Sequence, residues 1–427
     1  MKLKSVPGGW YLHPFEIGIA GGSREQREGL ADRIVAGLSN EGLRCGVVTI
    51  ETEPTTEPDG SAAEWARVRA DGSRLSIPNG PRGPQTSLIQ QSLATADVLM
   101  VTGADATPVP TLMLFEGEAR GLEGESLVAA VCDRSSVARA ASAARQSGGL
   151  PVVAGDDDEA ILETVRASFG RRTPPVRGLV LAGGKSTRMG RDKAAIEFTP
   201  GVSQARRTAD LLSEVCDSVY LSARSDQSLP ADVRHLPVIA DRYDGIGPVG
   251  GMLSAFAHDP QAAWFVVGCD MPLLEAGDVR ELFEARNPYR LATCFATPAD
   301  APQGHVAANG EATGGNAEQG HAAHTDAPRG HVAPSRETTG GSAELLPEPL
   351  CAIYEPKART RIFTFLADGV TCPRWMLRNG GADLVRPARA QAVYNANNPD
   401  DLARAADSIR AGQAVAGASS QPRETRK

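Results

Sequence analysis

The fold of the second half of the chain is decided by residues 181–193, which read LAGGKSTRMGRDK. Just before them, residues 177–180 form a short apolar run that is typical of a buried parallel strand. Because Gly183 and Gly184 lack a Cβ atom, backbone N–H groups of the following loop can approach a polyphosphate closely. The stretch therefore predicts an α/β domain with a phosphate-binding loop at a strand end.

The same loop carries three cations that suit a phosphate ligand, namely Lys185, Arg188 and Lys193. The loop has neither the GxxxxGK[ST] spacing of a Walker A loop nor the GxGxxG spacing of a dinucleotide-binding loop. The alternative is a surface turn with solvated charges. The coincidence of two glycines, three cations and a preceding strand favours the phosphate site.

Composition limits the class of protein. A length of 427 residues suggests two domains, and a net charge of −8 gives no support for nucleic-acid binding. No apolar run is long enough for a membrane span, and the first residues, MKLKSVPGGWYLHP, lack the apolar core of an export signal. The seven cysteines form no CxxC pair, which favours buried thiols in a reducing compartment over a zinc site. We therefore expect a cytoplasmic protein without nucleic-acid or membrane partners.

Two series of alternating strands and helices predict two Rossmann-like domains with mainly parallel sheets. The boundary is expected at 171–175, RRTPP, because paired prolines cannot continue a helix. The domains would span 1–172 and 176–427, and the chain would be loose from 412 onward. The expected elements are strands at 15–20, 45–50, 97–102, 127–132, 150–154, 177–182, 218–223, 264–269 and 290–296, with helices at 24–40 and 156–169.

Residues 298–347 interrupt the second domain and contain almost no large apolar residue. They hold a duplication, APQGHVAANGEATGGNAE from Ala301 and APRGHVAPSRETTGGSAE from Ala327. Neither copy can bury a core, so this is not a solenoid. We expect a disordered low-complexity insertion in a loop, which chain-closure entropy tolerates.

The LAGGKSTRMGRDK stretch resembles the nucleotide loop of sugar-nucleotide-type nucleotidyltransferases, which have a GT-A-like fold. Its Leu-Ala-Gly-Gly form is most similar to the molybdenum cofactor guanylyltransferases (the MobA family), over about residues 176–410. The resemblance implies that Leu181, Ala182, Gly183, Gly184 and Lys185 bind the nucleotide.

A second segment of this resemblance is VIADRYDGIGPVGGM, residues 238–252, in which a strand ends at Asp241 before a Gly/Pro-rich turn. The family has an Asp at the matching place, which implies that Asp241 recognises guanine through its N–H donors. Capping of the turn is the alternative role for Asp241. A family Asn that contacts the nucleotide aligns with Ser222, which keeps hydrogen-bonding ability but has a shorter reach.

A third segment, WFVVGCDMP at 264–272, places Asp270 after a buried strand. Ligands of open α/β sheets bind at the carboxyl ends of the strands, so Asp270 is expected to face the glycine loop. The matching Asp of the family holds Mg²⁺, a cation that prefers oxygen ligands and phosphates. The resemblance thus implies that Asp270 is the metal ligand and that Asp270, Lys193 and Arg188 are the catalytic residues, whereas helix capping is the alternative for Asp270.

A fourth segment, AVYNANNPDDL at 392–402, resembles the closing motif of the family and would place Asn395 and Asn397 at the second-substrate edge. Helix capping is the alternative for each asparagine. A His-Pro pair common in the family is replaced here by Glu348-Pro349, a departure that bears on pterin recognition.

The reaction implied by the resemblance transfers GMP from GTP to molybdopterin or the molybdenum cofactor and releases pyrophosphate. Mg²⁺ is the implied cofactor, and molybdenum-insertion proteins and molybdoenzyme apoproteins or chaperones are the implied partners. Two alternatives stay open. One is a related cytidylyl- or other NTP transferase acting on a phosphorylated small molecule, and the other is a non-catalytic scaffold that binds the molybdenum cofactor.

The N-terminal domain resembles the molybdopterin-guanine dinucleotide adaptor GTPases (the MobB family). A strand ends in Ile19-Ala20-Gly21-Gly22-Ser23 before a helix, but Arg24-Glu25-Gln26 stand where that family has Gly-Lys-Thr. Thr102 stands where an acid is usual. We therefore expect a degenerate P-loop domain that does not hydrolyse GTP.

Overall fold

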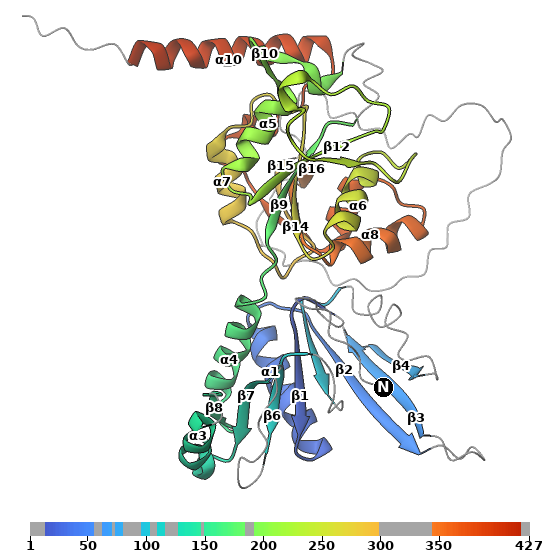
Figure 1. Ribbon diagram of the computed structural model, residues 1–427, viewed down its shortest axis with the longest axis vertical. Helices are drawn as coiled ribbons and strands as arrows, with labels where there is room; N and C mark the ends of the chain where they lie inside the picture. The colour runs from blue at the N-terminus through green and yellow to red at the C-terminus, as the bar shows by residue number, and fades with distance from the viewer. Residues whose placement is uncertain are drawn as a thin grey trace, which may run out of the picture.

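The computed structural model describes residues 13–54, 62–70, 73–79, 95–102, 109–115, 127–146, 149–183, 192–298 and 344–419. Gly184, Lys185 and Arg188 of the predicted phosphate loop and the duplicated segment at 299–343 lie outside these residues. Within the part that is described, helices and strands alternate in two α/β domains (Figure 1). No helix among these residues is long and apolar enough to cross a membrane.

The N-terminal domain is built on an eight-stranded sheet in the order β4-β3-β2-β5-β1-β6-β7-β8. The strands from β2 to β8 in this order are parallel, whereas β3 and β4 add an antiparallel hairpin at one side. Its elements are β1 (Glu16–Gly21), α1 (Arg24–Asn40), β2 (Cys45–Pro54), β3 (Ala62–Ala70), β4 (Ser73–Asn79), β5 (Val98–Thr102), β6 (Thr111–Leu114), β7 (Leu127–Cys132), α3 (Val137–Gln146), β8 (Val152–Ala154) and α4 (Asp158–Gly170).

The core of this domain forms where α1 and α4 pack on the sheet. Leu30, Ile34 and Leu38 recur on α1 at helical spacing and are all buried, as is Val165 of α4. Strands β3, β4 and β6 were not expected from the sequence. Charged residues alternate along β3, β4 is a mixed polar and apolar stretch, and β6 has four residues, so none of the three gives a strong apolar run.

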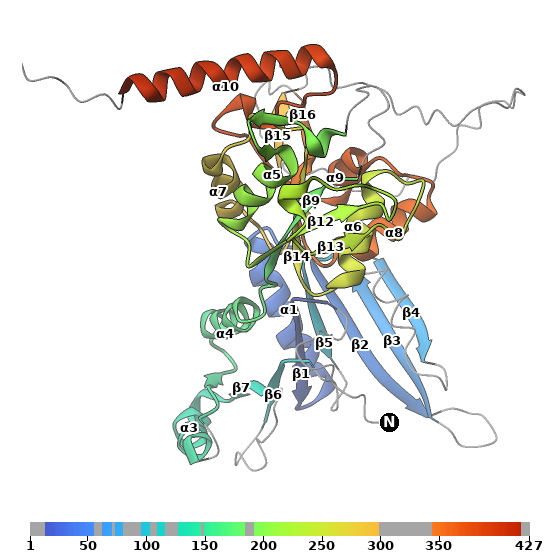
Figure 2. The same cartoon turned by 45° about the horizontal axis from the view of Figure 1, so that its top comes forward.

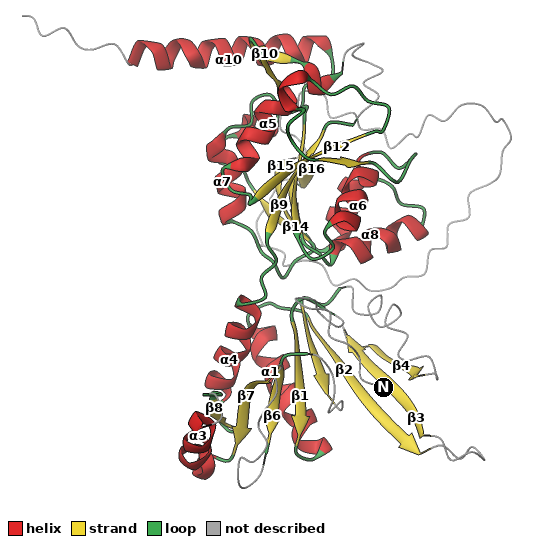
Figure 3. Cartoon of the chain, in the orientation of Figure 1, coloured by secondary structure: helices red, strands yellow, loops and turns green. Residues whose placement is uncertain are grey.

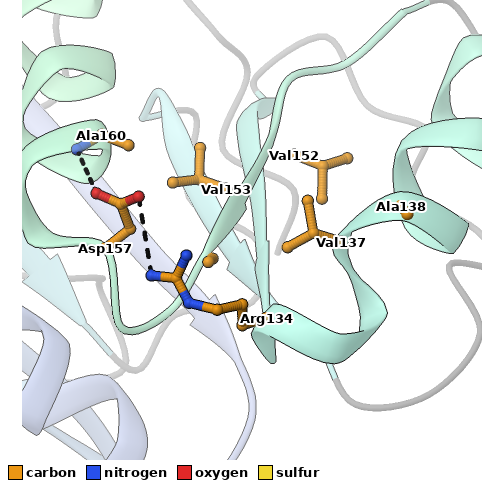
Figure 4. A pocket seen from close by; sticks show the side chains of 8 residues that line it. Arg134, Val137, Ala138, Val152, Val153, Asp157 and Ala160 are labelled. Atoms are coloured by element: carbon orange, nitrogen blue, oxygen red, sulfur yellow. Dashed lines mark hydrogen bonds and ion pairs between the residues drawn. The ribbon is translucent and has the colours of Figure 1, made fainter.

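A pocket of about 450 Å³ lies in the N-terminal domain between α3, β8 and the start of α4. Figure 4 shows that Val137, Val152 and Val153 supply its apolar wall, while Arg134 and Asp157 approach each other at its rim. The ion pair between Arg134 Nη2 and Asp157 Oδ2 is long, at 3.9 Å, and both side chains are exposed. The pocket lies far along the sheet from β1 and contains none of the predicted site residues.

The second domain has a seven-stranded sheet in the order β13-β12-β9-β14-β16-β15-β17. Among the strands that the structure describes in this sheet, only β16 runs antiparallel to its neighbours. The elements are β9 (Val176–Leu181), β10 (Glu197–Thr199), β11 (Val202–Ser203), α5 (Gln204–Ser213), β12 (Ser218–Ala223), β13 (Val238–Ala240), α6 (Pro248–His258), β14 (Ala263–Gly268), α7 (Ala276–Glu284), β15 (Ala292–Pro298), β16 (Leu345–Tyr354), α8 (Ala358–Ala367), α9 (Pro373–Gly380), β17 (Asp383–Val385) and α10 (Pro399–Ser419).

Helices cover both faces of this sheet, as Figure 3 shows, with α5 and α7 on one face and α6 and α8 on the other. Strand β9 contributes side chains to the cores on both faces of the sheet. Val180 packs in the core beneath α5 and α7, and Leu179 packs in the core beneath α6 and α8. A central strand that is buried on both faces explains the continuous apolar run that marked it in the sequence.

Two sequence boundaries are corrected by the structure. Strand β15 continues to Pro298, which pairs with Leu345 at the start of β16, so the ends of the predicted 298–347 insertion are strand residues. The predicted loose stretch from 412 is helical as far as Ser419, because α10 continues through it. Apolar pattern was too weak to show either, since β16 opens with Leu345-Leu346-Pro347-Glu348 and the end of α10 is rich in Ala and Gly.

The order of the strands places a topological switch between β9 and β14. The chain moves from β9 outward to β12 and β13, and then returns to add β14 on the other side of β9. In open α/β sheets the ligand crevice lies at such a switch, beyond the carboxyl ends of the strands. The glycine loop after β9 and the Asp270 segment after β14 both emerge there.

The two domains meet at the amino edges of their sheets, where the parallel strands begin. Asp97 precedes β5 in the N-terminal domain, whereas Lys357 follows the antiparallel strand β16 in the second domain, and these side chains form an ion pair. Tyr289 of the second domain packs against Phe15 and Phe169 of the first, with ring centroids 4.5 and 6.3 Å away. Figures 1 and 2 show that β1 and β2 point away from the second domain. The carboxyl edges of the two sheets therefore face in opposite directions.

Candidate active site

The carboxyl edge of the second sheet gathers Lys193, Asp270 and Asn397 from three distant segments. Asp192 caps the short 3₁₀ helix Lys193–Ala195 by accepting from Ala194 N–H, and this fixes the start of the Lys193 side chain. Lys193 Nζ then donates to Asn397 Oδ1 at 2.8 Å and lies 3.4 Å from Asp270 Oδ2. Both charged side chains stay about one-fifth exposed, so a ligand can reach them.

Asp270 has one carboxylate oxygen that is buried and unpaired. Its Oδ2 faces Lys193, whereas Oδ1 has no hydrogen-bond partner among the described residues. Gly268 makes room for this atom, because a Cβ there would lie 2.6 Å from Oδ1. A desolvated carboxylate oxygen without a partner is costly unless a ligand or ion satisfies it. Asp270 therefore fits a role as an oxygen ligand for a divalent cation.

The described residues contain no cluster of three or more His, Cys, Asp or Glu side chains that would hold a metal alone. Mg²⁺ is commonly held in proteins by one or two carboxylates together with substrate phosphates. A cation at Asp270 would thus depend on a phosphate ligand.

A second polar group lies on the other side of β9. Ser222 is buried near the end of β12 and donates from Oγ to Asp241 Oδ1 at 2.6 Å. Two glycines leave space around this pair. A Cβ on Gly251 would lie 2.4 Å from Ser222 Oγ, and a Cβ on Gly183 would lie 3.0 Å from Asp241 Oδ2. Asp241 keeps Oδ2 available toward the glycine loop, and Ser222 orients Asp241 through its hydroxyl.

The start of the phosphate loop is anchored by main-chain bonds. The N–H groups of Ala182 and Gly183 both donate to Ser222 O, at 3.0 and 3.1 Å, and Leu181 pairs in register with Gly268 of β14. These contacts place the start of the loop, at residues 182 and 183, between the Asp241 side and the Asp270 side. The structure thus brings together the described site residues predicted from the sequence, in two groups that flank the end of β9.

Sequence reasoning missed Gln227. Its Nε2 donates at 2.8 Å both to Ala182 O and to Asp192 Oδ2, the residues on either side of the loop 183–191. One side chain therefore holds the two ends of the predicted phosphate loop. No local pattern marks Gln227, because its role depends on the fold that brings it to residues far away in the sequence.

Glu348 was noted in the sequence only as a departure from a family pattern, but it is part of the site. It is buried at the start of β16 and accepts from Asn395 Nδ2 at 2.9 Å. Arg374 Nη2 lies 3.4 Å from the same oxygen, Oε2. Burial raises the pKa of Glu348, the charge of Arg374 opposes this, and the negative charge of Asp270 adds to it. The half-buried side chain of Asn395 is thus tied to a buried acid.

An open, mainly parallel sheet with polar side chains at its carboxyl edge and switch point is the architecture of nucleotide-binding α/β domains. Residues 178–376 match the MobA-like NTP transferase domain family. This range contains the glycine loop, Asp241 and Asp270, whereas Asn395 and Asn397 lie beyond it.

Curated relatives match parts of the chain. It is 30% identical over 228 residues to the molybdenum cofactor biosynthesis bifunctional protein of Synechocystis sp., which covers 53% of this chain and 52% of that protein. It is 37% identical over 128 residues to the molybdenum cofactor guanylyltransferase of Rhodopseudomonas palustris, covering 28% of this chain and 59% of that protein. The chain thus spans between half and three-fifths of the length of these relatives.

A crystal structure of molybdopterin-guanine dinucleotide biosynthesis protein A from Archaeoglobus fulgidus also aligns with the chain. The alignment covers 55% of this chain and 99% of that one, with 17% identity and a TM-score of 0.38. The relation to known proteins is therefore carried by the sequence matches.

Proposed function

We propose that the chain is a molybdenum cofactor guanylyltransferase, which transfers GMP from GTP to the terminal phosphate of molybdopterin or of the molybdenum cofactor. The observation that carries the proposal is the placement of Lys193 and Asp270 beside the end of β9, with the Ser222–Asp241 pair on the other side. This arrangement offers a charge-neutralising group and a base-recognising group on either side of one glycine loop. The family match over residues 178–376 and the names of the relatives support the same chemistry.

The proposed reaction forms a bond between an oxygen of the acceptor phosphate and the α-phosphorus of GTP, and it breaks the bond between the α-phosphorus and the bridging oxygen to the β-phosphate. Pyrophosphate leaves with the electron pair of that bond. Because the attacking phosphate is already anionic, the site needs no general base. Catalysis then depends on in-line positioning and on stabilising the charge that develops on the leaving group.

The residues divide these tasks. Lys193 neutralises phosphate charge, Gln227 keeps the ends of the loop together, and Asp241 accepts from the N–H donors of guanine through Oδ2. Asp270 would hold the divalent cation, which we infer to be Mg²⁺. When bound, Mg²⁺ would add positive charge next to the triphosphate.

We further propose that the N-terminal domain is a degenerate MobB-like P-loop domain. Its β1–Gly21-Gly22–α1 turn has the form of a phosphate loop, but the polar groups of the turn are already used. Ser23 and Gln26 cap each other's N–H groups at the start of α1, and Arg27 Nη1 donates to both Gly21 O and Gly22 O. Thr102 bonds to Thr49 at 3.0 Å in place of an acid. A triphosphate would have to displace these contacts.

The orientation of the domains supports separate roles for them. The Gly21-Gly22 turn follows the carboxyl end of β1, the edge of the sheet that faces away from the second domain (Figure 1). The N-terminal domain therefore contributes no side chain from this turn to the transferase site of the same chain.

The test is a transfer assay with the purified chain, molybdopterin, Mg²⁺ and each of the four NTPs in turn. Pyrophosphate release and the mass of the dinucleotide product are measured together. GTP is expected to support transfer at least ten times faster than CTP, ATP or UTP. A preference for CTP would instead identify a cytidylyltransferase, and binding of molybdopterin without pyrophosphate release would identify a scaffold. Release of inorganic phosphate from GTP would contradict the proposal that the N-terminal domain is a degenerate P-loop domain.

A further inference from the structure

Two asparagines at the proposed second-substrate edge use opposite ends of their side-chain amides to bond within the protein. Lys193 Nζ donates to Asn397 Oδ1 at 2.8 Å, so the amide oxygen of Asn397 is occupied and its NH₂ group is left for a ligand. Asn395 is reversed, because its Nδ2 donates to Glu348 Oε2 at 2.9 Å and to Val393 O at 3.3 Å. Both N–H bonds of Asn395 are then used, and its amide oxygen is the group that remains.

The Glu348 carboxylate is itself fixed on every side that the structure describes. Its Oε1 accepts from Leu350 N–H at 3.1 Å, and Arg374 Nη2 lies 3.4 Å from Oε2. Arg374 is held in turn by donating from Nε to Pro347 O at 2.9 Å. Every partner that the described residues give Glu348 is a donor, and the two oxygens of a carboxylate can accept from all of them. A buried acceptor surrounded by donors fixes the amide of Asn395 in one orientation.

We propose that Glu348 is a positioning residue that turns the Asn395 amide oxygen toward the second substrate, where this oxygen accepts an N–H bond from the pterin ring. The proposal rests on the guanylyltransferase function proposed above. It follows from the chemistry of the two amides: a carbonyl oxygen repels a phosphate and attracts an N–H donor, whereas an NH₂ group does the reverse. The two asparagines therefore favour different ends of the substrate, the phosphate and the pterin ring. Asn397, beside Lys193, faces the anionic phosphate, and Asn395 faces the heterocycle.

Glu348→Gln is the sharpest test, because it keeps the shape of the side chain and removes one acceptor. An amide at 348 has one oxygen and one NH₂ group. In one orientation its NH₂ group faces the NH₂ group of Asn395, and in the other it faces the N–H group of Leu350. We expect the KM for molybdopterin to rise about tenfold, in line with the loss of a hydrogen bond to a charged acceptor. The KM for GTP and kcat should change less than threefold. Glu344→Gln is the matched control, since Glu344 is exposed just before the same strand and should have no effect.

A second substitution separates positioning from simple structural support. In the Glu348→Gln background, Asn395→Asp restores the bond between the two side chains, because the amide at 348 can donate to one carboxylate oxygen at 395 and leave the other as an acceptor for the ring. The long bond to Val393 O, at 3.3 Å, is lost in this variant. The double variant should recover a KM for molybdopterin within about threefold of the starting protein. Asn395→Asp alone should be worse than Glu348→Gln alone, because it sets two carboxylates against each other.

Thermal unfolding of each variant is followed alongside the kinetics. The inference is overturned if Glu348→Gln leaves the KM for molybdopterin unchanged, if it raises the KM for GTP equally, or if the two substitutions are additive. Those outcomes differ from failure of the proposed function, in which the starting protein itself releases no pyrophosphate. Direct titration of molybdopterin by its pterin fluorescence gives the same comparison without turnover, and its dissociation constant should follow the KM.

Discussion

Lys357 Nζ lies 3.0 Å from Asp97 Oδ1, and this ion pair joins the two domains across 260 residues of sequence. Asp97 is completely buried and also bonds to Arg290 of the second domain at 2.7 Å and to Arg44 of its own domain at 2.9 Å. Burial raises the pKa of Asp97, but the surrounding cations outweigh it and hold the pKa at about 2. One carboxylate thus bonds to three cations, two of them from the second domain, and the interface depends on it.

Asp97→Asn should loosen the interface without touching the transferase site. It keeps the shape of the side chain but removes the negative charge that Lys357, Arg290 and Arg44 share, and breaking a buried ion pair in this way typically costs about 3–5 kcal/mol. We expect a lower unfolding temperature and a larger radius of gyration by small-angle scattering, with the KM for GTP unchanged. Asp158→Asn is the matched control, because Asp158 pairs with Arg33 on the exposed surface of one domain. An unchanged unfolding temperature in Asp97→Asn would contradict the role of this interface.

The stability that Asp97 contributes should disappear in acid. Its pKa falls from 3.8 in the unfolded chain to about 2 in the folded one, so the contribution is complete above about pH 4 and is lost as the pH falls through 2. At neutral pH the difference corresponds to about 2–3 kcal/mol. The gap in unfolding free energy between the starting protein and Asp97→Asn should therefore narrow between pH 4 and pH 2, as measured by urea titration. A gap that is constant over this range would contradict the lowered pKa of Asp97 in the folded protein.

Lys357 adds a second rise in stability with pH, in the alkaline range. Burial lowers its pKa to about 8, although Asp97 partly offsets this. Between pH 8 and 10.5 the unfolded chain binds more protons at this position than the folded chain, so this group makes the protein more stable as the pH rises. Lys357→Met should remove that rise while leaving the acid transition dependent on Asp97. Urea titrations at pH 8 and pH 10 of both proteins test this.

Asp270→Asn should keep the fold and lower turnover at least about 100-fold, the size expected when a charge-stabilising group is removed. The amide keeps one oxygen near Lys193, but it gives up the negative charge that the unpaired Oδ1 offers to a cation. Circular dichroism checks the fold, and pyrophosphate release measures turnover. Asp407→Asn, on the exposed surface of α10, is the control and should be fully active. Near-normal turnover in Asp270→Asn would remove Asp270 from the catalytic residues.

How far the sequence predicted this site depends on the range of the interactions. Strand β9 was predicted from its apolar run, as were β12 and β14. Asp270 and Asp241 follow strand ends, where local pattern already indicates a crevice. The bonds from Gln227 to both ends of the loop and the ion cluster of Asp97 join segments that are distant in the sequence. Such contacts depend on packing, and no periodicity or motif marks them.

Gln227→Ala tests the first of these long-range contacts. Removing the side chain takes away the donor that joins Ala182 O to Asp192 Oδ2, so the two ends of the loop are no longer linked by these hydrogen bonds. Because the loop is the proposed triphosphate site, we expect the KM for GTP to rise about fivefold to tenfold, as for the loss of one or two hydrogen bonds. The KM for molybdopterin should stay the same. Gln261→Ala, on a loop at the other end of the sheet, is the control. Equal effects on both substrates would point to general damage of the fold.

Deletion of residues 300–343 should leave stability and transfer activity intact. Pro298 pairs with Leu345, so the ends of β15 and β16 already lie side by side and a short Gly/Asn turn can join them. The deleted segment carries the duplicated polar unit and has almost no large apolar residue, so its loss removes little buried surface. Shortening a long closed loop also lowers the entropic cost of folding slightly. We expect an unfolding temperature equal to or a little above that of the full chain, with kcat and both KM values within twofold. A drop of several degrees, or a raised KM for molybdopterin alone, would show that the segment packs on the domain or binds the second substrate.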